Sequence, residues 1–193
     1  MKSLLLNTFA LMLALLSVPA SASPAVSANG TTVTGKTWNR PSSNGLLPPI
    51  PPLSSVGTNV QFEFEQLYVD LAGTYSFKST ATNPAGWDNY TFLYKDAFNP
   101  VSPIANVLIA NDDLGTVGGP SGFSIALLAN TNYFFVNTGF NNSDAGAFTK
   151  EISGPGNIYL NASAPVPTPA PEPLTLALLG LGLAGLGLAR RKY

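Results

Sequence analysis

Residues 61–65 read Gln-Phe-Glu-Phe-Glu, an uninterrupted alternation of polar and aromatic side chains. Successive side chains of a β-strand point to opposite faces, so this stretch predicts a strand with phenylalanine on one face and glutamine and glutamate on the other. Residues 74–78 (Thr-Tyr-Ser-Phe-Lys) repeat the pattern, and residues 90–94 (Tyr-Thr-Phe-Leu-Tyr) place ring residues two apart. A period of two, found three times, indicates a β-protein.

Further short segments of the same kind occur along the chain, at 31–37, 107–110, 123–128, 133–137, 147–152 and 157–160. Clusters of Gly, Pro, Asn and Asp separate them, which is typical of turns between strands. Residues 47–52 hold four prolines in six positions and cannot form a central strand, so 41–56 is expected to be a rigid excursion. We predict an all-β fold, an antiparallel β-sandwich or jelly roll.

Composition excludes several classes of function. The chain has 193 residues, no Cys, no His, and only 10% charged side chains, against about 25% in typical domains. Without these two residues there are no disulfides, no cysteine nucleophile, no Ser-His-Asp triad and few familiar transition-metal sites. A net charge of −1 gives no electrostatic footprint for nucleic acid. We expect one domain that binds no nucleic acid.

The N-terminus has the three parts of a secretory signal. A single cation precedes an apolar run at 4–18, and Pro-Ala-Ser-Ala follows at 19–22. The small residues Ala20 and Ala22 fit signal peptidase, which is expected to cut after Ala22. An uncleaved anchor helix is the alternative, although the run is short of the roughly 20 residues that span a bilayer.

The C-terminus carries a second apolar segment. A tether rich in Pro, Ala, Ser and Thr leads to Pro171-Glu172-Pro173, and residues 174–189 contain only Leu, Ala, Gly and one Thr. This run is barely long enough to cross a bilayer, and the cations Arg190, Arg191 and Lys192 place its end in the cytoplasm. Everything before it would then lie outside the inner membrane. A permanent single-span anchor and a helix that is later removed both remain open.

Pro-Glu-Pro, a short Leu/Gly/Ala helix and a basic end, in this order at the C-terminus, resemble the PEP-CTERM sorting signal of Gram-negative bacteria. The resemblance implies recognition by an exosortase, a membrane transpeptidase, with removal of the helix near residues 171–173. It also implies an exported cell-surface or extracellular-matrix protein, often in bacteria that make exopolysaccharide and biofilm matrix. Signal peptidase and an exosortase are thus the expected processing partners, and the inner membrane holds the intermediate.

The exported middle also resembles a known fold. Trp87 to Tyr94, the Asn-Asp-Asp at 111–113 and the segments at 129–135 and 152–156 are ordered as in the all-β ectodomain of PEP-CTERM proteins, which is similar to the pre-peptidase C-terminal sandwich. We divide the chain into a signal peptide, which is the N-terminal signal helix (1–22), an exported sandwich (23–162), a Pro-rich tether (163–173), a transmembrane sorting helix (174–189) and a basic tail (190–193).

Asp112 and Asp113 are candidate calcium ligands, because they follow a predicted strand in a loop and carboxylates suit Ca²⁺. Asp96 could approach them across the sheet. The alternative is turn chemistry, since Asn and Asp bond their own backbone. No EF-hand spacing supports the metal, so no cofactor is expected beyond a possible Ca²⁺.

Trp38 and Trp87 are candidate sugar-stacking residues, each flanked by polar side chains. The alternative is that each tryptophan closes a sandwich core. Glu63 and Glu65 could in principle serve glycoside hydrolysis, but two carboxylates on one strand face indicate no cleft. We therefore expect a non-enzymatic surface or matrix protein. The alternative is a carbohydrate-binding module, with or without the assistance of calcium.

Overall fold

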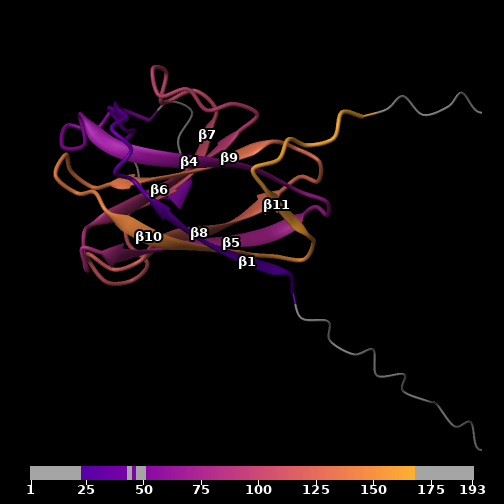
Figure 1. Cartoon of the computed structure of the whole chain (residues 1–193). Coiled ribbons are helices and arrows are strands. Elements are labelled where there is room, and N and C mark those ends of the chain that lie inside the picture. The colour runs from indigo at the N-terminus through magenta and orange to yellow at the C-terminus, as the bar shows by residue number, and fades with distance from the viewer. Residues whose placement is uncertain (1–22, 43–44, 47–50, 168–193) are drawn as a thin grey trace, which may run out of the picture. The chain divides into compact units, whose positions relative to one another are not determined.

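The computed structural model describes residues 23–42, 45–46 and 51–167, and within these ranges every regular element is a β-strand (Figure 1). The strands are β1 (Ala25–Thr31), β2 (Thr37–Trp38), β3 (Gly45–Leu46), β4 (Val60–Val69), β5 (Gly73–Asn83), β6 (Asn89–Lys95), β7 (Val107–Asn111), β8 (Ser121–Leu127), β9 (Tyr133–Gly139), β10 (Ala147–Ser153) and β11 (Ile158–Leu160).

These strands form two stacked sheets (Figure 1). The first has the order β1-β10-β5-β8, and the second has the order β11-β4-β9-β6-β7-β3, with β2 paired to β4. All pairings between these strands are antiparallel. The predicted all-β antiparallel sandwich is confirmed.

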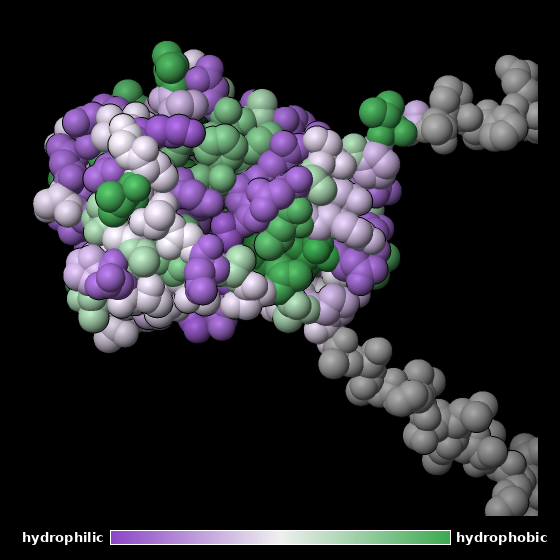
Figure 2. Space-filling view, viewed as in Figure 1, coloured by the Kyte–Doolittle hydropathy of each residue, from purple (hydrophilic) through white to green (hydrophobic). Residues whose placement is uncertain are grey.

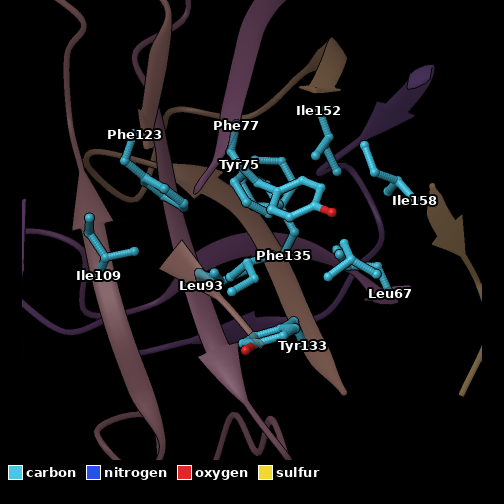
Figure 3. Close-up of a cluster of buried hydrophobic side chains, with 12 residues drawn as sticks. Leu67, Tyr75, Phe77, Leu93, Ile109, Phe123, Tyr133, Phe135, Ile152 and Ile158 are labelled. Carbon is cyan, nitrogen blue, oxygen red and sulfur yellow. The ribbon is translucent and has the colours of Figure 1, made fainter. Parts of the chain in front are cut away.

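One end of the space between the sheets is apolar. Side chains from both sheets point toward one another there (Figure 3). We call this cluster the apolar end: Leu67, Val69, Tyr75, Phe77, Leu93, Ile109, Phe123, Leu127, Tyr133, Phe135, Ile152 and Ile158. Phe77 and Phe135, from opposite sheets, have ring centroids 5.1 Å apart. Removing these rings from water is the main force that holds the sheets together.

The other end of the same space is polar. We call these side chains the polar end: Glu63, Glu65, Ser79, Asn89, Thr91, Ser121, Asn137 and Lys150. All are buried except Glu63, which is partly buried. Hydrogen bonds between the sheets hold them, such as Asn89 Nδ2 to the Ser79 carbonyl (3.0 Å) and the hydroxyl pair of Thr91 and Ser121 (2.7 Å).

The polar end corrects the expected facing of β4. Glu63 and Glu65 were predicted to share the polar face of the strand, and in the structure this face points between the sheets toward Lys150 of β10. Phe62 and Phe64 instead lie on the outer face of the seven-stranded sheet, where Phe62 is buried and Phe64 is exposed. The alternation in β4 was predicted correctly, but at this end the polar face of the strand, rather than the aromatic face, meets the other sheet. The polar face can be buried there because the ion pair with Lys150 compensates the two carboxylates.

The outer face of the seven-stranded sheet carries a second cluster: Trp38, Val60, Phe62, Tyr90, Phe92, Tyr94, Ala110 and Val136. Its cover comes partly from β2 and from the Pro-rich segment that follows. Pro41 bridges Leu53, and Ser42 N donates to the Pro52 carbonyl (2.8 Å), so the described parts of 41–56 fold back on themselves. Ser42, Ser54 and Val56 of this segment line a pocket together with Tyr90 of the second cluster.

The first strand begins earlier than expected. Residues 31–37 were predicted as a strand, but residues 32–36 connect β1 (Ala25–Thr31) to β2 (Thr37–Trp38). The small side chains of β1 gave no alternation to read; Gly30, for example, leaves room for the ring of Phe148, whose Cζ would lie 2.5 Å from an added Cβ. Figure 2 shows an apolar area between β1 and β11. Val26 of β1 and Leu160 of β11 pack against the apolar end and are themselves only partly buried.

The chain divides after Ser163 into two units. In residues 23–42, 45–46 and 51–167 no helix has the length and apolar character needed to cross a membrane. The predicted signal peptide (1–22), transmembrane helix (174–189) and basic tail (190–193) lie outside the described residues.

Candidate functional site

Both tryptophans are core residues. Trp38 is 4% exposed, and its ring lies 5.3 Å from Phe92 and 5.5 Å from Phe62. Its Nε1 donates to Thr138 Oγ1 at 3.1 Å. Trp87 is 6% exposed and donates to the Ala147 carbonyl at 2.9 Å. Neither indole presents a face on which a sugar ring could stack, so the geometry favours the packing alternative for both.

Other aromatic side chains reach the surface beside the second cluster, the one that contains Trp38. We call them the aromatic row: Phe64, Tyr68, Phe98, Phe134 and Tyr159. Phe64 and Tyr159 are 40% and 39% exposed, and the other three are partly buried.

Strand register explains why the aromatic row shares one face. Tyr68 of β4 is directly opposite Tyr159 of β11, and their rings stack at 4.5 Å with planes 5° apart. Phe64 lies two strand periods before Tyr68 on the same face, with its ring 6.1 Å from Phe134 and 5.1 Å from Phe98. The rings therefore line one continuous stretch of the sheet surface.

Polar groups lie among the rings. Gln66, between Phe64 and Tyr68 on the same face of β4, donates from Nε2 to Asn132 Oδ1 and Ser163 Oγ, both at 3.1 Å. Asp70 follows β4 and accepts two hydrogen bonds from Asn157, from the backbone N at 2.8 Å and from Nδ2 at 2.7 Å. Among the described side chains of this set, Asp70 is the only charged one.

A second candidate site surrounds Arg40, which is buried just after β2. The Arg40 guanidinium lies 4.2 Å from the ring centroid of Tyr90, and Nε and Nη2 donate to the Phe140 carbonyl at 3.0 and 2.6 Å. A pocket of about 240 Å³ opens here, lined in part by Ser42, Ser54 and Asp112. Fixed by carbonyls and stacked on a ring, this cation is structural in character.

Asp112 lies on the rim of this pocket with an altered acidity. Burial, reinforced by the nearby carboxylates of Asp88 and Asp113, raises the pKa of Asp112 to about 6, while Arg40 opposes the shift. Asp96, the expected neighbour, is at the wrong end of β6. The antiparallel pairing sets Asn111 against Thr91, so Asp112 follows toward the start of that strand, where Asp88 lies.

The fit of this loop to calcium is poor. Asp113 Oδ1 accepts a hydrogen bond from Gly119 N at 3.2 Å, which is the turn role named as the alternative. In the described part of the chain, no group of three or more acidic side chains is arranged to hold a metal. The calcium site at Asp112 and Asp113 stays a prediction.

The predicted processing sites all fall outside the described residues: Ala20 and Ala22 at the signal cleavage, Pro171, Glu172 and Pro173 at the tripeptide, and Arg190, Arg191 and Lys192 at the basic end. Their evidence is the sequence itself. Residues 169–192 match the PEP-CTERM protein-sorting motif. The chain is thus an exported bacterial protein that an exosortase sorts through a membrane-anchored intermediate.

Comparisons of the whole chain add little. No curated protein matches it in sequence. Among solved structures, the CBM35 from Cellvibrio japonicus Abf62 is 7% identical, with 72% of this chain and 99% of that chain covered at a TM-score of 0.36. A Cowpea mosaic virus empty particle is 14% identical, covering 79% and 82% at 0.25. With TM-scores this low, these likenesses carry no inference about what this chain binds.

The sequence held a signal for the aromatic row that was not used. Outward positions of β4 are aromatic at 62, 64 and 68, while the inward positions 67 and 69 are also apolar. A strand that is apolar on both faces predicts cover on both sides or an exposed binding surface. Which of these rings are covered depends on the path of residues 32–59, and the sequence of that segment shows no regular alternation from which its path could be predicted.

Proposed function

We propose that this protein is a non-enzymatic cell-surface or extracellular-matrix component of a Gram-negative bacterium, and that its sandwich adheres to an uncharged exopolysaccharide through the aromatic row. The single observation that supports it is the exposed line of rings with amide and carboxylate groups between them. Export and sorting by an exosortase bring such a surface to the place where polysaccharide is found.

The chemistry of the surface favours a sugar polymer over other partners. Aromatic faces bind apolar C–H surfaces, and the side chains of Gln66, Asp70 and Asn157 can bond hydroxyl groups. The described side chains of this surface include no cation to attract an anionic polymer, and its one carboxylate is already bonded to Asn157. A neutral, hydroxyl-rich chain fits both features.

The absence of catalysis is part of the proposal. The chain has no His and no Cys. The two glutamates that could in principle serve hydrolysis, Glu63 and Glu65, both contact the Lys150 ammonium between the sheets. Carboxylates held by one cation in the interior have no substrate cleft between them.

The binding test compares the exported protein with Phe64→Ala/Tyr159→Ala in affinity electrophoresis through gels that contain the neutral exopolysaccharide of the producing bacterium. Each ring is expected to contribute about 1 kcal/mol, so retardation weakens at least ten-fold. The matched control is Val101→Ala/Val117→Ala, which removes two exposed apolar side chains elsewhere and leaves retardation unchanged. Equal retardation of the ring variant would refute the binding proposal.

Sorting is tested separately. Glu172→Ala, or deletion of residues 190–192, is expected to leave the full-length precursor in the inner-membrane fraction. Mass spectrometry of both termini then distinguishes signal cleavage from C-terminal processing. Normal maturation of these variants would contradict processing by an exosortase without bearing on polysaccharide binding.

A further inference from the structure

Lys150 is a buried cation between the sheets. It lies on β10, is 4% exposed, and points toward β4 of the opposite sheet. Its Nζ contacts Glu65 Oε2 and lies 3.3 Å from Glu63 Oε1. The Phe148 ring, 5.8 Å from Nζ, forms an apolar neighbour. A lysine in such a place is held in one position rather than moving freely in water.

Asn137 lies beside this pair. It belongs to β9, and the register with β4 sets it directly opposite Glu63, with both side chains directed between the sheets. The Asn137 side chain is fully buried, and its amide interacts with the Glu63 carboxylate, an interaction that acts to lower the pKa of Glu63. Glu63 therefore has the Lys150 ammonium on one side and the Asn137 amide on the other, so that an amine and an amide carbon lie beside the same buried carboxylate.

We propose that Lys150 and Asn137 join in an isopeptide bond that fastens the two sheets together. The bond forms between Lys150 Nζ and Asn137 Cγ, and the bond between Asn137 Cγ and Nδ2 breaks. This modification goes beyond the proposed function and does not depend on it.

The atoms and charges of this reaction balance without an oxidant or a co-reactant. The Glu63 carboxylate takes a proton from the Lys150 ammonium, and the resulting amine attacks the Asn137 carbonyl carbon. Glu63 returns the proton to the departing amide nitrogen, and the second proton lost by the attacking nitrogen follows it. The Lys150 ammonium and the Asn137 amide thereby become one secondary amide and one ammonium ion. Electrons move only as bonding pairs.

The surroundings suit Glu63 for this transfer. Burial raises the pKa of Glu63 above its ordinary value, against the opposing influence of Lys150. A carboxyl group with a raised pKa accepts a proton more readily, which a general base for an amine requires. Glu65, which also accepts from Asn161 Nδ2 at 2.8 Å, holds the ammonium in place from the other side. Glu63 is therefore assigned as the proton carrier and Glu65 as a positioning residue.

The bond would also remove a costly arrangement. Two carboxylates and one ammonium in the interior lose much of their hydration. Once the cation has become a neutral amide, Glu63 takes up a proton from the medium, because burial raises its pKa. The link runs from β9 of the seven-stranded sheet to β10 of the four-stranded sheet. It would add a covalent tie at the end of the sandwich where few apolar side chains hold the sheets together.

The test is mass spectrometry of the exported protein as cells produce it. With both termini identified from end peptides, the intact mass is expected to be lower than the sequence mass by one ammonia. Cleavage at Asp144, between the two residues, should leave their fragments joined. An unaltered mass with two separate fragments would overturn the proposal, and loss of one water with Lys150 joined to a glutamate would overturn Asn137 as the acceptor.

Variants of the protein identify which side chains form the bond and which one carries the proton. Lys150→Met and Asn137→Ala should restore the sequence mass of each variant, and Glu63→Gln should leave the chain unlinked. The matched control is Lys78→Met, because Lys78 pairs with Glu151 at 3.2 Å on the exposed side of the same sheet, and the ammonia deficit should persist in it. A deficit that remains in Lys150→Met would refute the link, and one that remains in Glu63→Gln would refute the role of Glu63. Because the wild-type mass is decisive alone, a variant that fails to fold does not remove the test.

Discussion

The apolar end and the polar end of the sandwich are built by the same strands. Strand β4 sends Leu67 and Val69 into the apolar end and Glu63 and Glu65 into the polar end. Likewise, Leu93 of β6 lies in the apolar end, while Asn89 and Thr91 of the same strand lie in the polar end.

The two ends differ in how they depend on individual partners. Dispersion and the hydrophobic effect are nondirectional, so rings in the apolar end need volume and shape rather than a particular atom opposite. A buried amide or carboxylate needs a matching group at hydrogen-bond distance. If that group is removed, the polar atom stays buried without a partner and the folded state is destabilised. The apolar end thus supplies most of the stability, and the polar end makes the alignment of the sheets specific.

The largest effect is expected at the apolar end. Phe135 is fully buried, with its ring 5.1 Å from Phe77 of the opposite sheet. Phe135→Ala should lower the free energy of unfolding by about 3–5 kcal/mol, because it removes a ring and leaves a cavity. Guanidinium unfolding followed by circular dichroism measures it. Phe64→Ala, an exposed phenylalanine on the same sheet, is the control, and an equal loss in both would contradict the difference in burial.

A smaller effect is expected at the polar end. Asn89 Nδ2 donates to the Ser79 carbonyl at 3.0 Å and to Ser79 Oγ at 3.1 Å, all of it buried. Asn89→Ala should cost about 2 kcal/mol, since the carbonyl stays buried without its donor. The control is Asn142→Ala, which removes exposed hydrogen bonds and should cost under about 0.5 kcal/mol. Similar unfolding midpoints for the two variants would show that the polar end does not need its specific partners.

The smallest effect concerns pH near the polar end. The pKa of Asp112 is raised from 3.8 to about 6 when the chain folds, so between these values the folded state holds a proton that the unfolded state has lost. The contribution of Asp112 to the free energy of unfolding is therefore fully present below about pH 4 and decreases as the pH rises toward about 6. Above that pH it does not change further. Because Asp112 is partly exposed, the loss is expected to be about 1 kcal/mol.

Asp112→Asn should reduce this slope without abolishing it, because burial also raises the pKa of Asp88 and of Glu63. Unfolding midpoints measured across that pH window give the result. A wild-type stability that rises between about pH 4 and about pH 6 would have the wrong sign for these shifts.

Much of the fold was predictable because its signals are local. Residues 74–78 and 90–94 alternate as expected, and both lie within strands, β5 and β6. Turn residues at 83–84 and 154–156 separated strands correctly. Alternation fixes which residues share a face, but it does not say which face meets the other sheet.

The site was less predictable for that reason. Trp38 and Trp87 looked suited to stacking on sugars, yet neighbouring segments cover them, while Phe64 looked like core and is exposed. The approach of Lys150 to Glu63 joins residues 87 positions apart, which no local pattern reveals. Asp112 meets Asp88 rather than Asp96 only because β6 and β7 run antiparallel.

By itself the sequence determined that this protein is exported and which class of fold it has, since a linear motif at 169–192 and a period of two are read from neighbouring residues. Only the tertiary structure decided which rings face solvent and which charges are enclosed. Those outcomes depend on contacts between distant strands, whose free energy comes from excluding water from both partners together.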